Sequence, residues 1–442
     1  MRRARLRLWL SRTFIVVSTL ALLAYALLIG AILVFERAPA ATGQPVPSSS
    51  ERTIDPRYAD AIRAARGHVQ GIVEQCRIPG LSVAVAVDGR IVWSEAFGYA
   101  DRERAILASP RTRFRVASVS KLFTTAAMAR LYEVGRLDLD APVQRYVPGF
   151  PDKGYPITPR QLASHRSGIR SYRDDSEALA IKHYGSVSDS LERFRDDPLA
   201  FAPDSDFHYS VYGYVLLSAM IEGAAGEDFL AGMRRLVFEP LGMNSTVPNY
   251  ADRAAPEQSR FYDHVTPYSL DGSIVPSPDN DMSYKWASGG FLSTAEDLVR
   301  FGSAHVPALD QGFLAPDTLE TLFRPRTTHT GLLGYGLGWM TMRDLHLRRA
   351  CFHFGAGSGA TSVLFVYPEQ RTCFAMVANL GHAKFPFDQL MGVFNLFLGS
   401  GRLYAAGAAV LLINLICWCW HVRTRKLLRI QRAPSPNTSE SP

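Results

Sequence analysis

Two uncharged apolar runs near the ends of the chain constrain its fold most. Thr13–Phe35 has 23 residues without a charged side chain, and Leu403–Trp420 has 18. A helix needs about 20 such residues to cross the hydrocarbon core of a membrane. We therefore expect one transmembrane helix within residues 1–37 and another over residues 401–421. The alternatives are a signal peptide cleaved near residues 38–40 and a buried C-terminal helix of the folded domain.

Basic residues flank both runs on the side of the nearer terminus. The chain has 48 Lys and Arg against 41 Asp and Glu, a net charge of +7. Residues 1–12 contribute +5 and residues 421–442 contribute +4, which leaves −2 for everything between. Nucleic-acid binding thereby loses its main support. Basic residues beside a membrane span mark its cytoplasmic side, so we expect both termini, including the basic tail 422–442, in the cytoplasm.

This topology predicts a location for the rest of the chain. The residues between the two runs would lie outside the cytoplasm, in the periplasm of a bacterium, anchored to the inner membrane by two helices. The cysteines do not decide the compartment. Cys417 and Cys419 fall inside the second run, and Cys76 has no evident partner. Cys351 and Cys373 lie on apolar segments of one predicted sheet, so a disulfide between them stays open.

Composition also separates a linker from a folded domain. Residues 38–56 are rich in Pro, Ser, Thr and Ala and contain almost no large apolar side chain, which is typical of a flexible linker. We expect a single folded domain over residues 57–400.

The folded domain shows strand patterns at both of its ends and helical patterns between them. Leu81–Val87 and Ile91–Phe97 are rich in β-branched residues, and Asp88-Gly89 between them predicts a hairpin. The pattern favours an α+β fold, in which an antiparallel sheet built from N- and C-terminal strands is flanked by helices and interrupted by a helical insertion. Further strands are expected at Gly334–Met340, Ala350–Phe354, Thr361–Tyr367 and Thr372–Val377, and helices at Arg57–Cys76, Ser118–Gly135, Gly213–Gly223, Asp228–Leu236, Ala295–Phe301 and Phe385–Phe397.

A serine followed three residues later by a lysine opens one of these helices. Ser118-Val119-Ser120-Lys121 fits the pattern S-x-x-K. The spacing puts both side chains on one helix face, so that the amine lies beside the hydroxyl. A desolvated lysine with a lowered pKa can take the proton of a serine and make it nucleophilic.

Two further segments could complete a site. Tyr209 and Ser210 precede a helical run, where a tyrosine hydroxyl can move protons; the alternative is a tyrosine at the domain surface. His353 and Gly355 lie on a predicted strand whose glycines would let a ligand approach closely; a structural histidine is the alternative. The motifs of zinc peptidases, dinucleotide-binding proteins, P-loop proteins and α/β-hydrolases are absent from the sequence. We expect no cofactor and no metal.

The three motifs S-x-x-K, Y-x-x and H-x-G, in this order, resemble the serine β-lactamase and penicillin-binding protein superfamily. The resemblance is to its class C and esterase-like branch, which has mitochondrial and bacterial members, and it covers residues 57–398. It is carried by FRVASVSK, ITPRQLASHRSGIRSY, FHYSVYGYVLLSAMIE, SYKWASGGFLSTAEDLVRF and HFGAGSGATSVLFVYPE. The resemblance implies a β-lactamase/transpeptidase-like fold.

The resemblance also implies a role for each motif residue. Ser118 would be the acylated nucleophile, Lys121 its base, and Tyr209 the acid that protonates the leaving group. His353 would orient the substrate or the tyrosine. The backbone N–H groups of Ser118 and Ala356 would form the oxyanion hole, with Gly355 and Ser210 in substrate contact.

Two departures from the family pattern bear on the substrate. Val211 stands where penicillin-binding members carry an amide-binding Asn, and His353 stands where they carry a lysine. Both favour a peptidase or esterase over a β-lactamase. The sequence thus predicts a membrane-anchored serine hydrolase that acts on a peptide or ester through an acyl-enzyme. The alternatives are a non-catalytic binding or filament-forming scaffold on the same fold, for which self-association is possible, and a cell-wall D,D-peptidase.

Overall fold

The computed structural model describes residues 2–35, 45–52, 55–250, 257–265, 273–309, 311–329, 333–399, 411–416 and 418–423. The chain forms two compact units. One comprises Met1–Arg37, Leu345–Leu347 and Gly399–Pro442, and the other comprises Ala38–Asp344 and Arg348–Leu398.

The first unit contains helix α1 (Arg2–Phe35) and the helical residues 411–416 and 418–423. Within the described residues, no helix combines the length and the apolar character that a membrane span requires. The two predicted transmembrane helices are therefore wrong, and so is the location built on them, an inner-membrane protein with a periplasmic domain. The uncharged run 13–35 is only part of a helix that begins at Arg2 and includes five arginines. Near the other end, residues 411–416 and 418–423 are the described part of the second run and its basic flank, and they are helical.

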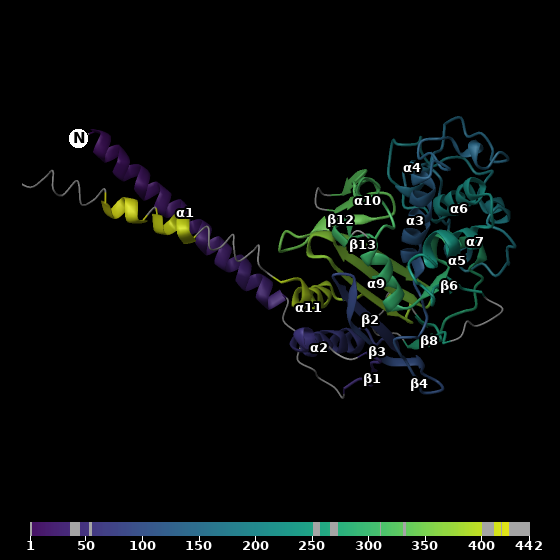
Figure 1. Ribbon diagram of the computed structural model, residues 1–442, viewed down its shortest axis with the longest axis horizontal. Helices are drawn as coiled ribbons and strands as arrows, with labels where there is room; N and C mark the ends of the chain where they lie inside the picture. Colours follow the sequence, from purple (N-terminus) through teal and green to yellow (C-terminus); the bar gives the residue numbers. More distant parts are fainter. Residues whose placement is uncertain are drawn as a thin grey trace, which may run out of the picture. The chain divides into compact units, whose positions relative to one another are not determined.

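The second unit is built on an antiparallel sheet (Figure 1). Its strands lie in the order β1-β3-β2-β15-β14-β13-β12-β11-β10, with β4 paired to β3. The N-terminal strand β2 and the C-terminal strand β15 are neighbours, and Val85 pairs with Phe374. The predicted sheet from both ends of the domain is found. The strands are β1 (Ser48–Ser49), β2 (Gly80–Val87), β3 (Arg90–Asp101), β4 (Ile106–Leu107), β10 (Thr327–His329), β11 (Leu333–Tyr335), β12 (Met340–Arg343), β13 (Arg349–Gly357), β14 (Ala360–Tyr367) and β15 (Thr372–Ala378).

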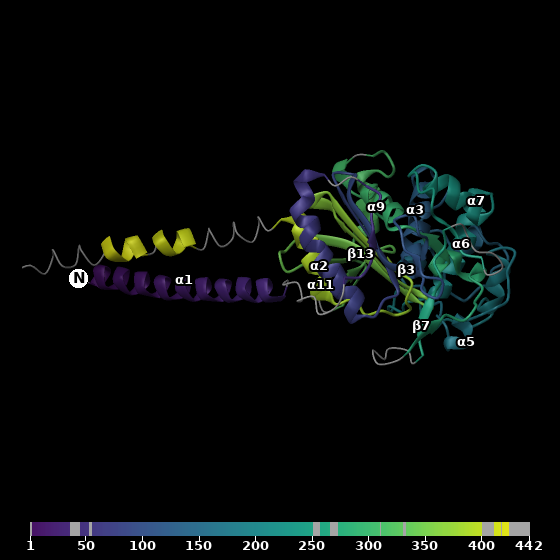
Figure 2. The same cartoon turned by 90° about the horizontal axis from the view of Figure 1, so that it is seen from below.

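Helices cover both faces of this sheet (Figure 2). Helices α2 (Ala59–Gln75) and α11 (Phe387–Leu398) lie on one face, and α9 (Ala295–Ser303) and α3 (Ser120–Glu133) lie on the other. Alternate strand residues point to opposite faces. On β2, Val83 and Val85 belong to the core under α2 and α11, whereas Ala84 and Ala86 belong to the core under α3 and α9. The sheet is therefore buried on both sides.

The helical insertion lies between β4 and β10 and extends the core that lies under α3 and α9. Its remaining helices are α4 (Pro159–Ala163), α5 (Asp175–Ala178), α6 (Val211–Ala225), α7 (Phe229–Met233), α8 (Trp286–Gly289) and α10 (Pro316–Phe323). Two small sheets accompany them, β5 (Phe114–Arg115) with β9 (Phe291–Ser293) and β6 (Val247–Pro248), and β7 (Tyr262–His264) with β8 (Ile274–Pro276). Helix α3 is the central element, since it contacts α6, α7, α8 and α10.

Local predictions and the structure differ at two places, and the structure also decides the disulfide that the sequence left open. The expected strand Gly334–Met340 is two strands, β11 and β12, joined by a turn in which Gly338 has φ 82°. Part of the expected linker 38–56 forms β1, which pairs with the edge of β3. Cys351 and Cys373 are free and buried. Both are in register with Val366 on the strand between them, so their Cα atoms are about 9 to 10 Å apart, too far for a disulfide.

The stability of the unit depends on aromatic packing between β15 and α11. Phe374 is 1% exposed, and its ring stacks on Phe394 at 4.3 Å. We predict that Phe374→Ala lowers the free energy of unfolding by about 3 to 5 kcal/mol, because it leaves a cavity in the core. Leu107→Ala, at a half-exposed position on β4, should change it by only about 0.5 kcal/mol. Urea denaturation measures both, and equal effects would contradict this packing.

Candidate active site

Ser118 lies on a short 3-10 helix, Ala117–Val119, that leads directly into α3. Ala117 has φ 42°, a left-handed conformation that costs a residue with a Cβ roughly 1 to 2 kcal/mol. Strained backbone of this kind clusters at functional sites. The bend presents the half-buried Ser118 at the N-terminus of α3, beside the sheet.

Lys121 lies one turn further along and is fully buried. Its Nζ is 3.2 Å from Ser118 Oγ and donates a hydrogen bond to the carbonyl of Ser288 on α8 at 2.8 Å. Burial, together with the nearby charge of Lys285, holds the pKa of Lys121 well below its usual value. The S-x-x-K spacing therefore places an amine that gives up its proton readily within reach of the serine hydroxyl.

Tyr209 meets this pair from the loop before α6. Its ring lies over Lys121, with Nζ 4.8 Å from the ring centroid. Burial of its hydroxyl raises the pKa of Tyr209, and a hydrogen bond with Ser118 opposes that shift. The phenol is thus protonated at neutral pH, whereas the pKa of the neighbouring amine is lowered. Such divergent pKa values distinguish an acid from a base within one site.

His353 is buried behind Tyr209 and belongs to a chain of neutral groups. The N–H of Ser210 donates to His165 Nδ1 at 3.0 Å, so the proton of His165 is on Nε2, which lies 3.0 Å from the Tyr335 hydroxyl. Tyr335 lies 3.2 Å from His353 Nε2, and His353 Nδ1 donates to the carbonyl of Phe354 at 2.5 Å. Burial and the nearby Lys121 lower the pKa of His353 to about 3. His353 is therefore uncharged at neutral pH.

The remaining predicted residues lie around this core. A Cβ on Gly355 would fall 2.3 Å from the carbonyl oxygen of Val116 and 3.2 Å from the nitrogen of Ser118, so glycine lets β13 lie directly against Ser118. Ala356, the next residue, faces the space beside Ser118. Ser210 is buried, and its hydroxyl accepts from the N–H of Gly213 and donates to the carbonyl of Arg170. It thereby caps α6 and fixes the loop that holds Tyr209.

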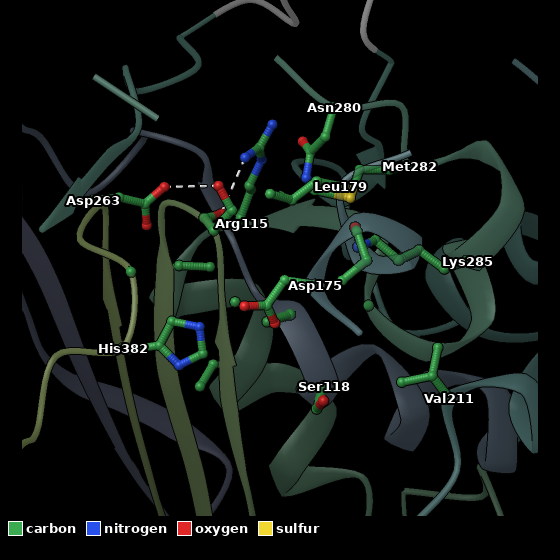
Figure 3. A pocket seen from close by; sticks show the side chains of 18 of the residues that line it. Arg115, Ser118, Asp175, Leu179, Val211, Asp263, Asn280, Met282, Lys285 and His382 are labelled. Carbon is green, nitrogen blue, oxygen red and sulfur yellow. Dashed lines mark hydrogen bonds between the residues drawn. The ribbon is translucent and has the colours of Figure 1, made fainter. Parts of the chain in front are cut away.

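Ser118 and Ala356 line two cavities. The first, of about 480 Å³, is called here the charged cavity. Its charged lining residues are Arg115, Asp175, Asp263 and Lys285 (Figure 3). The second, of about 440 Å³, is called here the apolar cavity and is lined by Ser118, Phe207, Tyr209, Leu333, Gly334, Tyr335, Met340, His353, Phe354 and Ala356. Ser118 is therefore shared by two cavities of different chemistry.

Two basic side chains, the buried Arg115 and the half-buried Lys285, line the charged cavity. Arg115 stacks on the ring of Phe261 at 4.0 Å and donates to the carbonyl of Ser358, and burial lowers its pKa to about 10. Lys285 donates to the carbonyl of Ala178 at 2.8 Å, and burial, followed by the charges of Arg115 and Arg193, lowers its pKa to about 7. Figure 3 places Ser118 at one end of this cavity and Asn280 at the other.

The sequence analysis missed several of these groups. His165, Tyr335, Arg115 and Lys285 received no role, although all of them except Tyr335 lie inside segments that carried the family resemblance. A single histidine or lysine in a loop gives no signal of its own, because only the tertiary fold makes it a neighbour of Ser118. Among the described residues, no cluster of three or more His, Cys, Asp or Glu side chains could hold a metal ion.

Comparison with known proteins agrees with this geometry. The family model described as Beta-lactamase matches residues 65–391. The chain belongs to the β-lactamase family. It is 32% identical over 405 residues to the mitochondrial serine beta-lactamase-like protein LACTB of Homo sapiens. The alignment covers 71% of this chain and 73% of that protein. The predicted family is confirmed.

Solved structures share the fold of this β-lactamase family member. The octameric penicillin-binding protein homologue from Pyrococcus abyssi superposes with a TM-score of 0.67 at 24% identity, over 76% of this chain and 77% of that one. A D-stereospecific amidohydrolase from Streptomyces sp. has a TM-score of 0.65 at 22% identity, over 76% and 98%. The predicted enzyme class, a serine hydrolase related to β-lactamases, is confirmed.

The close approach of β13 to Ser118 yields a prediction. Gly355→Ala should reduce labelling of the protein by a fluorophosphonate probe by about tenfold or more, because the new Cβ displaces β13, with its backbone N–H groups, from Ser118. Gly149→Ala serves as the control, since a Cβ there has no neighbour within 4 Å. Unchanged labelling of Gly355→Ala would show that this approach is not needed.

Proposed function

We propose that this β-lactamase family member hydrolyses a peptide or ester through an acyl-enzyme on Ser118, with Lys121 as base and Tyr209 as acid. The observation that carries the proposal is the 3.2 Å separation between Ser118 Oγ and the amine of a fully buried Lys121. An amine in bulk water would be protonated at neutral pH and could not accept the serine proton. Desolvation removes that obstacle.

In this mechanism Ser118 is first acylated and then released by water. Lys121 Nζ takes the proton of the Ser118 hydroxyl while Oγ attacks the substrate carbonyl carbon. The proton then passes through Tyr209 to the departing nitrogen or oxygen as its bond to carbon breaks. A water molecule next attacks the acyl-enzyme and gives up a proton to the same base, and the acid product leaves with the Ser118 hydroxyl restored. The raised pKa of Tyr209 keeps its proton available for donation.

The negative charge on the carbonyl oxygen needs donors. We assign this role to the backbone N–H groups of Ser118 and Ala356, because both residues face the space beside the nucleophile and Gly355 allows β13 to approach it. The loss of one such donor typically costs about 2.7 to 4 kcal/mol in the transition state. His353, held neutral by burial, fixes Tyr335 and the Tyr209 loop through the hydrogen-bonded chain described above.

A non-catalytic scaffold is the weaker alternative. A scaffold has no use for a buried amine beside a serine, and an uncompensated buried lysine is costly to retain. Self-association is compatible with catalysis. It is supported by the octameric state of the homologue from Pyrococcus abyssi, and light scattering of the purified protein would reveal it.

The assigned nucleophile gives the first functional prediction. Ser118→Ala should abolish labelling by a fluorophosphonate probe, because the proposed mechanism assigns the attack to the Ser118 hydroxyl, which lies 3.2 Å from Lys121 Nζ. Ser120→Ala is the matched control: its hydroxyl accepts from the N–H of Phe291, and labelling should persist. Mass spectrometry of the labelled peptide measures both. Labelling that survives Ser118→Ala would refute the proposal.

The lowered pKa of Lys121 predicts the pH dependence. Acylation needs the unprotonated amine, so the acylation rate should fall as the pH drops through the pKa of Lys121. Because this pKa is well below its usual value, the rate should reach its maximum well below pH 10.5. Lys121→Ala should slow acylation by about 100- to 10,000-fold. Lys285→Gln removes a positive charge that lowers this pKa, so its acid limb should move to higher pH.

Stopped-flow acylation across pH 4 to 10 measures these limbs. Lys182→Gln, at an exposed position, is the control and should leave the limb where it is. A limb that stays in place or moves to lower pH in Lys285→Gln would exclude coupling between the two lysines.

A further inference from the structure

We propose that the apolar cavity receives the leaving group, and that this hydrolase prefers substrates whose leaving group is apolar and uncharged. The inference rests on the proposed function, because it assumes that Ser118 is acylated. It adds a direction to the site, in which the acyl group lies in the charged cavity and the departing alcohol or amine lies in the apolar one.

The position of Tyr209 sets this direction. In the acylation step the carbonyl carbon becomes bonded to Ser118 Oγ, and the departing oxygen or nitrogen takes its proton from Tyr209. Tyr209 lines the apolar cavity together with Ser118, whereas the lining of the charged cavity beyond Ser118 comes from residues such as Val211, Lys285 and Ser288. The atom that receives the proton must lie next to its donor. The leaving group is therefore on the side of the apolar cavity.

The charged residues that line the two cavities also indicate which one suits an uncharged leaving group. Arg115, Asp175, Asp263 and Lys285 all line the charged cavity. Among the described residues that line the apolar cavity, none carries a formal charge at neutral pH, since the pKa of His353 is lowered to about 3. A carboxylate placed there would lose its hydration without gaining a cation. Leaving groups with a free carboxylate, as in a carboxypeptidase reaction, fit this cavity poorly.

The residues that line the apolar cavity favour an aromatic or branched aliphatic leaving group. Its walls are mainly aromatic and aliphatic, with Phe207, Tyr335, Met340 and Phe354 around a space of about 440 Å³. Phe354 and Tyr209 keep 38% and 37% of their surface exposed, which gives an incoming ring apolar surface to cover. An aromatic or branched aliphatic leaving group matches these walls. This chemistry disfavours the D,D-peptidase alternative, whose leaving group is an amino acid with a free carboxylate.

Three esters of one N-acetylated amino acid test the inference in the full-length protein. The alcohols are benzyl alcohol, 4-carbamoylbenzyl alcohol and 4-carboxybenzyl alcohol, so the series varies polarity and then charge at one position. We expect kcat/KM for the benzyl ester to exceed that for the carboxybenzyl ester by about tenfold or more, with the carbamoyl ester between them. Equal rates, or faster hydrolysis of the carboxybenzyl ester, would overturn the inference.

A variant pair locates the effect. Met340→Lys puts a cation in the apolar cavity and should raise the carboxybenzyl-to-benzyl ratio by about tenfold. Leu179→Lys adds the same charge to the lining of the charged cavity and should leave the ratio unchanged. A ratio that responds to Leu179→Lys and not to Met340→Lys would show that the leaving group lies in the charged cavity, and the inference would be wrong. If Met340→Lys does not fold, the ester series on the unmodified protein still decides.

The failure of the inference can be told from the failure of the proposed function. If a fluorophosphonate labels Ser118 but the esters show no preference, or none is hydrolysed, the leaving-group assignment is wrong and the nucleophile stands. If Ser118 is not labelled and no ester is hydrolysed, the acyl-enzyme mechanism itself is wrong, and the inference falls with it.

Discussion

The desolvation of Lys121 beside Ser118 is the interaction on which the site depends. A buried amine without a carboxylate partner is unfavourable in its charged form, so the fold stabilises the neutral form, which is the form that can accept a proton. Three contacts keep the amine of Lys121 buried. The carbonyl of Ser288 on α8 accepts from Nζ, the ring of Tyr209 covers it, and α3 carries it inside the core. Elements of the helical insertion thus enclose the amine of Lys121.

The sheet supplies the other half of the site. Strand β13 reaches Ser118 only because position 355 has no side chain, and β13 is held by β14, which pairs with β15 and through it with β2. The strand that borders Ser118 is therefore fixed by segments from both ends of the domain. The site lies at the boundary between sheet and insertion, where Ser118 divides a charged cavity from an apolar one.

Local patterns predicted what depends on local geometry. Asp88 and Gly89 have φ 51° and 75°, as a tight hairpin turn requires, and the three-residue spacing of Ser118 and Lys121 brought amine and hydroxyl together. Contacts between distant segments were not predictable. Tyr335 joins His165 to His353 only in the folded chain, and the two cysteines proved to be separated by a strand. The two predicted membrane spans were wrong, because no helix among the described residues is both long enough and apolar enough to cross a membrane.

Direct titration of Lys121 tests the central claim most closely. The ¹³Cε and ¹⁵Nζ signals of lysine-labelled protein can be followed by NMR across pH 5 to 11, with Lys121→Met to assign the resonance. Our account predicts that Lys121 titrates with a midpoint well below its ordinary value of 10.5 and is unprotonated where the enzyme acylates. A midpoint near 10.5 would contradict it, since Lys121 would then be charged at neutral pH and could not act as the base for Ser118.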